Sequence, residues 1–152
     1  VSVKYYISNT YLKSMKAHKA RHKAKGHGFG YEIKSHNEVA NSIVVGGMGK
    51  ERNLLIDKRL KDFTPITHIK GKVNRQGIRR MTPVEWERLQ GLPDNWTSVV
   101  SNVHRYKQLG NSVAVPVIEH IAINMLKELN NPQPYIGEPG ITLPLEFSSN
   151  AI

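Results

Sequence analysis

The sequence predicts an α+β fold, in which a small domain of short strands, hairpins and one basic helix is followed by two further helices. Three observations predict it: a capped helical pattern near the N-terminus, short apolar runs separated by glycine turns, and a capping box before the last third of the chain. The 152 residues suffice for one ordinary domain, or for one domain with an appendage. The chain begins with Val1 rather than Met, so we expect a piece of a longer protein.

The first helix is predicted from about Thr10 to Lys25, after a short β-like run at 5–7. Ser8 or Asn9 supplies the N-cap, and Gly26 is typical of a helix end. Its buried stripe is expected to contain Tyr11, Leu12, Met15 and the stem of Lys19. Its other face is almost entirely basic.

The middle of the chain reads as short strands and glycine turns. A Gly-aromatic loop at 26–31 is followed by runs at 42–45 and 53–57, which flank the glycines of 46–49 and predict a hairpin with Lys50 and Arg52 near its tip. Residues 67–73 are a further candidate strand, and 74–77 a turn into 78–80.

The clearest local signal is Thr82-Pro83-Val84-Glu85, a capping box with proline at the first helical position. It predicts a helix from Pro83 to about Gln90, with Met81 and Trp86 as a hydrophobic staple and Gly91 as its end. A loop at 94–105 should follow. Apolar residues at helical spacing then predict a last helix over about 113–129, before a proline-rich tail at 130–152.

Charge divides the chain into two unlike parts. Residues 1–80 hold 18 Lys and Arg against 5 Asp and Glu, a net charge of +13, whereas residues 81–152 hold 4 against 7, a net charge of −3. A basic surface of this size favours a phosphate-bearing partner, although lysine-rich surfaces also serve solubility alone.

Several classes of site are excluded or disfavoured. The sequence has no cysteine, so it offers no disulfide, no zinc-thiolate site and no cysteine nucleophile. His18 and His22 have metal-ligand spacing but lack the glutamate of a metalloprotease motif, and we expect no metal. The glycine-rich segments match neither a dinucleotide fingerprint nor a P-loop. No apolar run approaches the length of a membrane span, so no membrane partner is expected.

Two segments resemble conserved motifs of the DNA (cytosine-5) methyltransferases. Residues 79–93, Arg-Arg-Met-Thr-Pro-Val-Glu-Trp-Glu-Arg-Leu-Gln-Gly-Leu-Pro, resemble motif IX, with Met81 and Leu92 where the family has Leu and Phe. Residues 106–116, Tyr-Lys-Gln-Leu-Gly-Asn-Ser-Val-Ala-Val-Pro, resemble motif X. The resemblance extends over about residues 1–129.

The resemblance implies the C-terminal part of a bacterial-type enzyme of this family, beginning just after motif VIII. Residues 1–93 would be the target-recognition domain with motif IX. Residues 94–129 would be the motif X segment, whose amphipathic helix returns to a Rossmann-like catalytic domain, and 130–152 the tail. The reaction adds a thiolate to a flipped cytosine and transfers a methyl group from S-adenosylmethionine to C5. A chain without cysteine cannot supply that thiolate, so we expect no catalytic residue here and no activity of the chain alone.

Candidate site residues follow from these patterns. For DNA phosphates we name Lys16, Lys19 and Lys23. For base edges we name His27, Phe29, Tyr31, Lys50, Arg52 and Asn53. By resemblance, Gly110, Asn111 and Ser112 line the S-adenosylmethionine pocket, with Gly110 permitting a tight turn. Arg79, Thr82, Glu85 and Arg88 are structural residues of motif IX, with Glu85 hydrogen-bonded to Arg88 or Arg79. Glu85 is equally explained as a capping residue, and Ser112 as the N-cap of the last helix.

The expected partners are double-stranded DNA and a catalytic domain or subunit, in the bacterial cytoplasm and within a restriction-modification system. The apolar last helix also predicts self-association when that partner is absent. Two alternatives remain: a natural small subunit of a split methyltransferase, and an independent DNA-binding module without enzymatic function.

Overall fold

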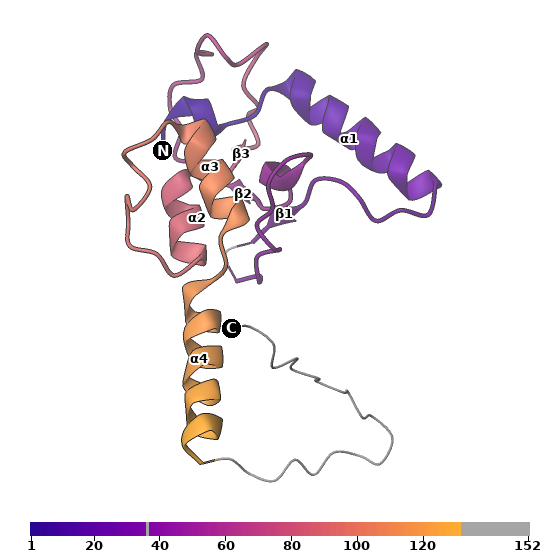
Figure 1. Ribbon diagram of the computed structural model, residues 1–152. Coiled ribbons are helices and arrows are strands. Elements are labelled where there is room, and N and C mark those ends of the chain that lie inside the picture. The colour runs from indigo at the N-terminus through magenta and orange to yellow at the C-terminus, as the bar shows by residue number, and fades with distance from the viewer. Residues whose placement is uncertain (36, 132–152) are drawn as a thin grey trace, which may run out of the picture. The chain divides into compact units, whose positions relative to one another are not determined.

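The computed structural model describes residues 1–35 and 37–131, and these residues divide into two units, the second of which begins at Glu119. The elements are shown in Figure 1 and are, in order, η1 Val3–Tyr5, α1 Asn9–Ala24, β1 Ile33–Lys34, η2 Gly49–Glu51, β2 Leu54–Ile56, β3 Ile78–Arg79, α2 Pro83–Leu89, α3 Asn102–Asn111 and α4 Val115–Asn130. The expected α+β class is confirmed. The tail beyond residue 131 lies outside the described residues.

The sheet is small and mixed. Its strand order is β1-β2-β3, with β1 parallel to β2 and β2 antiparallel to β3. Leu54 is opposite Ile33 and Leu55 is opposite Arg79, so residues distant in sequence meet across β2.

The predicted hairpin of 42–45 with 53–57 is wrong. Residues 42–45 form no strand, and the glycine segment leads into η2 instead of a two-strand turn. The Asn53 side chain instead bonds to the backbone just before the first segment: its amide donates to the Asn41 backbone carbonyl, and the Asn41 backbone N–H donates to its side-chain oxygen. Asparagine side chains thus replace the backbone ladder there, which leaves β2 free to pair with β1 and β3.

The strand expected at 67–73 is also wrong. Only Val73 pairs, in an isolated bridge with Ser8. The rest of that segment is a loop that contains a turn closed by Ile69 N–H donating to the Ile66 carbonyl.

Helix α1 forms as expected. The Ser8 side chain accepts a hydrogen bond from Tyr11 N–H at 3.1 Å, and Gly26 adopts a φ of 76° just past the helix end. Leu12 and Met15 are the buried residues of α1, whereas Tyr11 and Lys19 are exposed. The helix therefore buries two residues about one turn apart and leaves the basic remainder in solvent.

Two hydrophobic clusters hold the first unit together. One consists of Ile7, Leu12, Met15, Leu54 and Ile78, and it joins α1 to the sheet. The other consists of Leu55, Met81, Trp86, Tyr106 and Leu109, and it joins the sheet to α2 and α3. Because Leu54 and Leu55 point to opposite faces of β2, this one strand contributes to both clusters.

The structure corrects the segment after α2. The loop expected at 94–105 ends at Ser101, because α3 already begins at Asn102. Tyr106 and Leu109 are buried one turn apart and pack with Trp86, whose ring meets the Tyr106 ring edge-on at 4.9 Å between centroids. Packing against α2 therefore fixes a helix that the polar sequence at 98–105 did not suggest.

The second unit, taken by itself, contains the greater part of α4. Pro116 lies in the first turn of this helix, as expected. Asn102–Asn130 meets a length and hydropathy test for a membrane-spanning helix. These residues form two helices, however, because the backbone is extended at Ser112, and the first of the two is largely polar and packs on α2. The apolar stretch is therefore confined to α4, which is shorter than a typical span.

Candidate nucleic-acid interface

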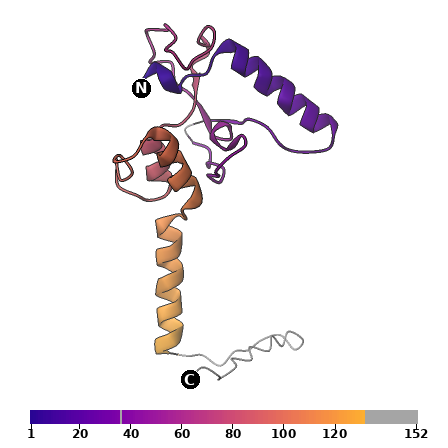
Figure 2. The ribbon, with the colours of Figure 1, turned by 45° about the horizontal axis from the view of Figure 1, so that its top comes forward.

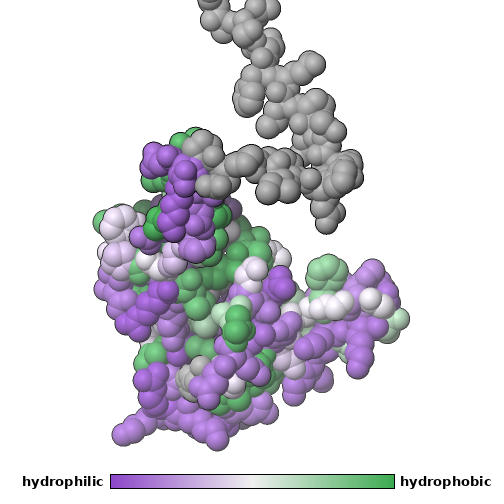
Figure 3. All heavy atoms as spheres, turned by 90° about the horizontal axis from the view of Figure 1, so that it is seen from below, coloured by the Kyte–Doolittle hydropathy of each residue, from purple (hydrophilic) through white to green (hydrophobic). Residues whose placement is uncertain are grey.

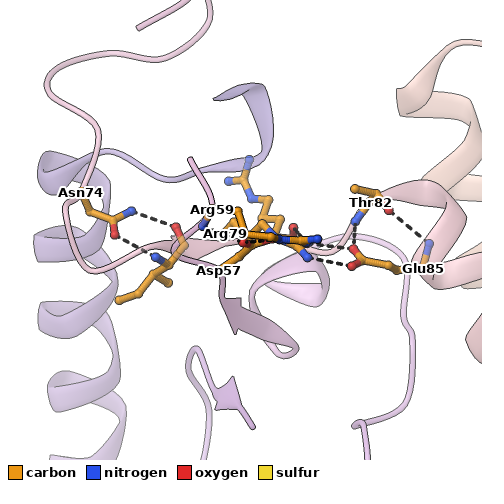
Figure 4. A network of polar contacts seen from close by, with 8 residues as sticks. Asp57, Arg59, Asn74, Arg79, Thr82 and Glu85 are labelled. Atoms are coloured by element: carbon orange, nitrogen blue, oxygen red, sulfur yellow. Dashed lines mark hydrogen bonds and ion pairs between the residues drawn. The ribbon is translucent and has the colours of Figure 1, made fainter. Parts of the chain in front are cut away.

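A buried ion-pair network joins β2, β3 and the start of α2 (Figure 4). Arg79 donates from Nε to Asp57 at 3.0 Å and from its two terminal nitrogens to both Glu85 oxygens, at 2.8 and 2.7 Å. Glu85 also completes the capping box, since it accepts from Thr82 N–H at 2.7 Å while Thr82 accepts from Glu85 N–H. The expected pairing of Glu85 with Arg79 is confirmed, and so is its capping role. The Glu85 carboxylate performs both at once.

Arg88 lies outside this network. It forms a bidentate pair with Asp94, and both side chains are largely exposed. Its pairing with Glu85, which was the other expectation, is not observed in the described residues.

A second buried network was not anticipated from the sequence. Glu87 is fully buried and accepts hydrogen bonds from Asn95 N–H, from the N–H and hydroxyl of Thr97, and from Arg105 at 2.8 Å. It thereby fastens the loop after α2 to α3. The available signal was the second glutamate in the α2 pattern, at a position that faces the core rather than solvent.

The basic face of α1 supports the Gly-aromatic loop. Figure 3 shows the surface of α1, at the right, as largely hydrophilic. Lys19 Nζ donates to the Tyr31 carbonyl at 3.0 Å and lies 5.2 Å from the centre of the Tyr31 ring. Gly30 lies against the Lys19 stem, where a Cβ would approach within 2.8 Å. Lys19 therefore positions the loop, and it remains exposed, as Lys16 and Lys23 are, so all three ammonium groups are open to solvent.

The far end of this loop packs on α1 through aromatic rings. Phe29 meets His22 edge-on at 5.8 Å and lies 6.1 Å from His27, and His18 stacks near His22 at 4.3 Å. Desolvation, with the charges of nearby histidines, lowers the pKa of His22. Within 1–35 and 37–131 no group of three ligating side chains could hold a metal ion. His27, Phe29 and Tyr31 are thus brought to one end of α1, next to exposed lysines.

The three residues expected at the second loop lie in different environments. Arg52 is exposed and accessible to a ligand. Lys50 is half-buried over the Tyr106 ring at 4.3 Å, and this burial lowers its pKa. Asn53 is only 1% exposed, and its amide bonds to the Asn41 backbone, so in this arrangement it holds the segment in place and is not open to a base edge.

The tight turn that was expected at Gly110 is not formed. Gly110 lies in the last turn of α3, not in a tight turn, and a Cβ there would come within 2.6 Å of Val45 Cγ2 and 2.9 Å of Val45 N. The expected N-cap role of Ser112 is also corrected: it is the C-cap of α3, and its hydroxyl donates to the Leu109 carbonyl at 3.1 Å. Gly110 thus permits the close approach of the 44–45 segment to α3.

Residues 109–115 are joined directly to the end of α2. The Gln90 side chain donates to the Leu109 carbonyl at 2.9 Å, and Val115 N–H donates to the Gln90 carbonyl at 2.8 Å. A cavity of about 460 Å³ lies here, with polar lining from Asn41, Ser42, Gln90 and Ser112. Asn111 is exposed and directly precedes the lining residue Ser112 in the chain, but it is not part of the lining. Amide and hydroxyl groups of this kind fit the amino-acid or ribose portion of a ligand such as S-adenosylmethionine.

Comparison with known proteins decides the family. The model of the C-5 cytosine-specific DNA methylase family matches residues 1–127. The chain belongs to this family.

Several DNA methylases are similar to the chain. Type II methyltransferase M.HpaII of Haemophilus parainfluenzae is 57% identical over 131 residues, which are 86% of this chain and 37% of that protein. M1.ScrFI of Lactococcus lactis subsp. cremoris is 34% identical over 85% of this chain and 30% of its own length, and M.NlaX of Neisseria lactamica is 34% identical over 84% and 36%. The chain thus spans about a third of the length of these relatives. No solved structure matches it.

The segments that resemble the methylase motifs contain the Arg79–Glu85 network and the residues bonded to Gln90. The residues resembling motif IX are β3, α2 and their buried arginine-glutamate pair, and those resembling motif X are α3 and the first turn of α4. Hydrogen bonds from Gln90 connect the two. The residues that match the methylase pattern therefore supply four of the five buried residues of the cluster that joins the sheet to α2 and α3.

Replacing Gly110 by alanine should destabilise the methylase chain by about 1–3 kcal/mol, because the new Cβ would overlap Val45 and neither backbone segment can move freely. Chemical denaturation followed by tryptophan fluorescence measures the change. Gly28→Ala is the matched control, since a Cβ at Gly28 meets nothing within 4 Å. Equal midpoints for the two variants would contradict the close approach.

Proposed function

We propose that this chain is the C-terminal, DNA-recognition part of a DNA (cytosine-5) methyltransferase of a bacterial restriction-modification system. In the complete enzyme a catalytic part supplies the cysteine nucleophile and most of the S-adenosylmethionine site, and acts on a cytosine flipped out of duplex DNA in the cytoplasm. The match of the family model to residues 1–127 carries this proposal. The absence of cysteine from the sequence supports the assignment of catalysis to another part of the enzyme.

The division of labour within the chain follows the proposed domains. Residues 1–93 recognise DNA, and residues 94–129 return to the catalytic part, with Asn111 and Ser112 bordering the cofactor. Gly110 contributes by packing rather than by contact. The apolar residues Ile121, Met125 and Leu126 of α4 are all exposed, and a Rossmann-like catalytic domain would cover them in the complete enzyme.

Complementation tests the proposal. The chain is mixed with the separately produced N-terminal part of the 57% identical relative, labelled S-adenosylmethionine and duplex DNA, and label transferred to DNA is counted. We expect transfer from the mixture and none from either part alone. Asn111→Ala should raise the KM for S-adenosylmethionine in the mixture, while Asn95→Ala, outside the proposed pocket, should not. Failure of every related catalytic part to restore transfer would overturn the proposal.

The chain alone should bind duplex DNA weakly and with strong salt dependence. Replacing Lys16, Lys19 and Lys23 together by glutamine should lower the slope of log affinity against log salt by about 3, because each phosphate contact contributes about 0.9. Fluorescence anisotropy between 50 and 300 mM salt measures it. The matched control replaces Lys58, Lys61 and Lys127. A slope unaffected by the α1 lysines would refute their assignment to phosphates.

Two alternatives make different predictions. A natural small subunit requires a separately encoded catalytic chain, which the reading frame upstream of this sequence would reveal. An independent DNA-binding module would bind DNA but would not restore methyl transfer with any catalytic part. The segment resembling motif X favours the methyltransferase, because an independent DNA-binding module does not require a cofactor-binding segment.

Self-association of the isolated chain is proposed from the same apolar helix. Analytical ultracentrifugation should show reversible dimers or larger species that dissociate when the catalytic part is added. A chain that remains monomeric at about 100 μM would refute self-association.

A further inference from the structure

A cavity of about 380 Å³ lies between η1, the start of α1 and the loop of residues 66–72. Figure 2 shows the chain following β2 passing close to η1 and the first turn of α1. Its polar lining comes from Lys4, Thr10, Ser14, His68, Lys70 and Arg80, and Ile7, Ile69 and the Tyr11 ring form an apolar wall. None of these residues is among those assigned above to DNA or cofactor.

The cavity is held in shape by backbone contacts. Asn9 N–H donates to the Lys72 carbonyl at 2.8 Å, and Asn74 N–H donates to the Ile7 carbonyl at 3.1 Å. Gly71 has a φ of 90° and approaches α1 so closely that a Cβ would lie 3.0 Å from the Thr10 hydroxyl. The loop is therefore fixed against the helix, and a ligand would meet a preformed site.

The lining carries positive charge without an acidic residue. Arg80 is paired with Glu51 at 2.8 Å, which lies outside the lining and offsets part of its charge. Lys4 and Lys70 form no ion pair within the described part of the chain. The ammonium groups can only donate hydrogen bonds, and the hydroxyls of Thr10 and Ser14 can also donate. This set selects an anion with several acceptor oxygens.

We propose that this cavity binds one phosphodiester of the DNA backbone, with Lys70 and Lys4 as the charged contacts and the apolar wall against the sugar. The inference rests on the proposed function, because it takes the same DNA as its ligand. DNA is favoured over a free phosphate because the exposed Arg21 lies seven residues after Ser14 on the same face of α1, so a strand held in the cavity meets a further cation along the helix.

Two charge variants test the site in the 152-residue chain. Lys70→Gln should lower the salt slope of duplex binding by about 1, equally for all DNA sequences, because it removes one phosphate contact. Lys61→Gln is the matched control, since Lys61 is exposed in the same connecting segment but does not line the cavity. We expect its slope to stay at the wild-type value.

A charge-neutral pair separates the cavity from general electrostatics. Ser14→Trp fills the cavity, whereas Ala17→Trp places the same ring on α1 outside its lining. Ser14→Trp should weaken DNA binding about as much as Lys70→Gln, and Ala17→Trp should not. Circular dichroism and melting temperature verify that all four variants fold.

The outcomes are distinct. Equal effects of Lys70→Gln and Lys61→Gln, or of the two tryptophan variants, would overturn the site while leaving DNA binding intact. If the unmodified chain binds no DNA, the proposed function fails, and titration with inorganic phosphate followed by NMR then decides the cavity. Saturable shifts of Lys70 and Ser14 that Ser14→Trp abolishes would retain an anion site for free phosphate and overturn the DNA assignment. Absence of such shifts would overturn the site altogether.

Discussion

Replacing Glu87 by alanine is expected to lower the free energy of unfolding by about 3–5 kcal/mol, as breaking a buried ion pair typically does. The substitution leaves Arg105 buried without its carboxylate and removes the acceptor of the Asn95 and Thr97 N–H groups. Unsatisfied buried donors add to the cost. Because domains of this size are stable by only about 5–15 kcal/mol, the variant should be close to unfolded at moderate temperature.

Urea denaturation measures this change, with Trp86 as a buried fluorescent probe in the same helix. The matched control is Arg88→Ala, one residue further along α2, which breaks a pair whose side chains are 65% and 46% exposed. Its midpoint should stay near that of the unmodified chain, since exposed pairs are screened by water. A double variant, Glu87→Met with Arg105→Met, should recover part of the loss, because it leaves no unpaired charge. Similar midpoints for Glu87→Ala and Arg88→Ala would contradict the role assigned to Glu87.

Replacing Arg79 by methionine should have an effect of the same order, about 3–5 kcal/mol. The side chain is buried, and it is the only one in the network of Figure 4 that contacts both Asp57 and Glu85. Its loss leaves Glu85 with the Thr82 cap alone and separates β2 from the start of α2. Arg79→Lys should recover only part of the stability, because an ammonium cannot form the two-pronged contact with Glu85.

Arg59→Gln is the control for this network, since Arg59 binds the same Asp57 carboxylate but its side chain is 75% exposed. We expect a small change in the denaturation midpoint at neutral pH. If Arg59→Gln proved as damaging as Arg79→Met, the stability of the junction would depend on the rim of the network and not on its buried centre.

The same carboxylates predict acid sensitivity. Hydrogen bonds from Arg59, and then from Arg79, hold the pKa of Asp57 well below its usual range despite its burial. Burial raises the pKa of Glu85 and of Glu87. The hydrogen bonds of Glu85 to Arg79, and of Glu87 to Thr97 and Arg105, lower these pKa values by more than burial raises them, so the net direction is down. The unfolded chain therefore binds protons at higher pH than the folded one. The stabilisation is complete above about pH 5 and is lost as the pH falls through the folded-state values.

Denaturation midpoints between pH 7 and pH 3 check this direction. The unmodified chain should lose stability steadily below about pH 5, whereas Asp57→Asn should start lower at pH 7 and change less on acidification. Parallel curves for the two proteins would exclude Asp57 as a source of the acid sensitivity.

Helix caps and helix ends could be predicted from the sequence because they depend on residues that are neighbours along the chain. The caps at Ser8 and at Thr82 with Glu85, and the helix ends at Gly26 and Gly91, follow from side chains within four residues, and the structure has them all. The strand pairing was misjudged because it depends on partners far along the chain. Leu54 pairs with Ile33, and Leu55 with Arg79, which lies 24 residues further on. A glycine turn between apolar runs indicates a hairpin only when no better partner competes.

The candidate site shows the same division. From sequence, the positive half of the chain and its Gly-aromatic loop could be assigned to a DNA surface, but the burial of Asn53 and the packing of Lys50 on Tyr106 could not be foreseen. Both result from contacts between segments separated by twelve residues or more, for which composition and periodicity carry no information.

The family, the basic character of residues 1–80, the absence of a cysteine and the two helix caps all follow from residue identity or from short spacings. How the segments are joined became apparent from the fold. In the fold, Glu87 and Arg79 lie at the centres of two buried networks, and Gly110 packs against Val45. The loop of residues 66–72, with Lys70, lies against the start of α1. The physical reason is that burial and ion pairing are set by where distant segments meet, which no local pattern specifies.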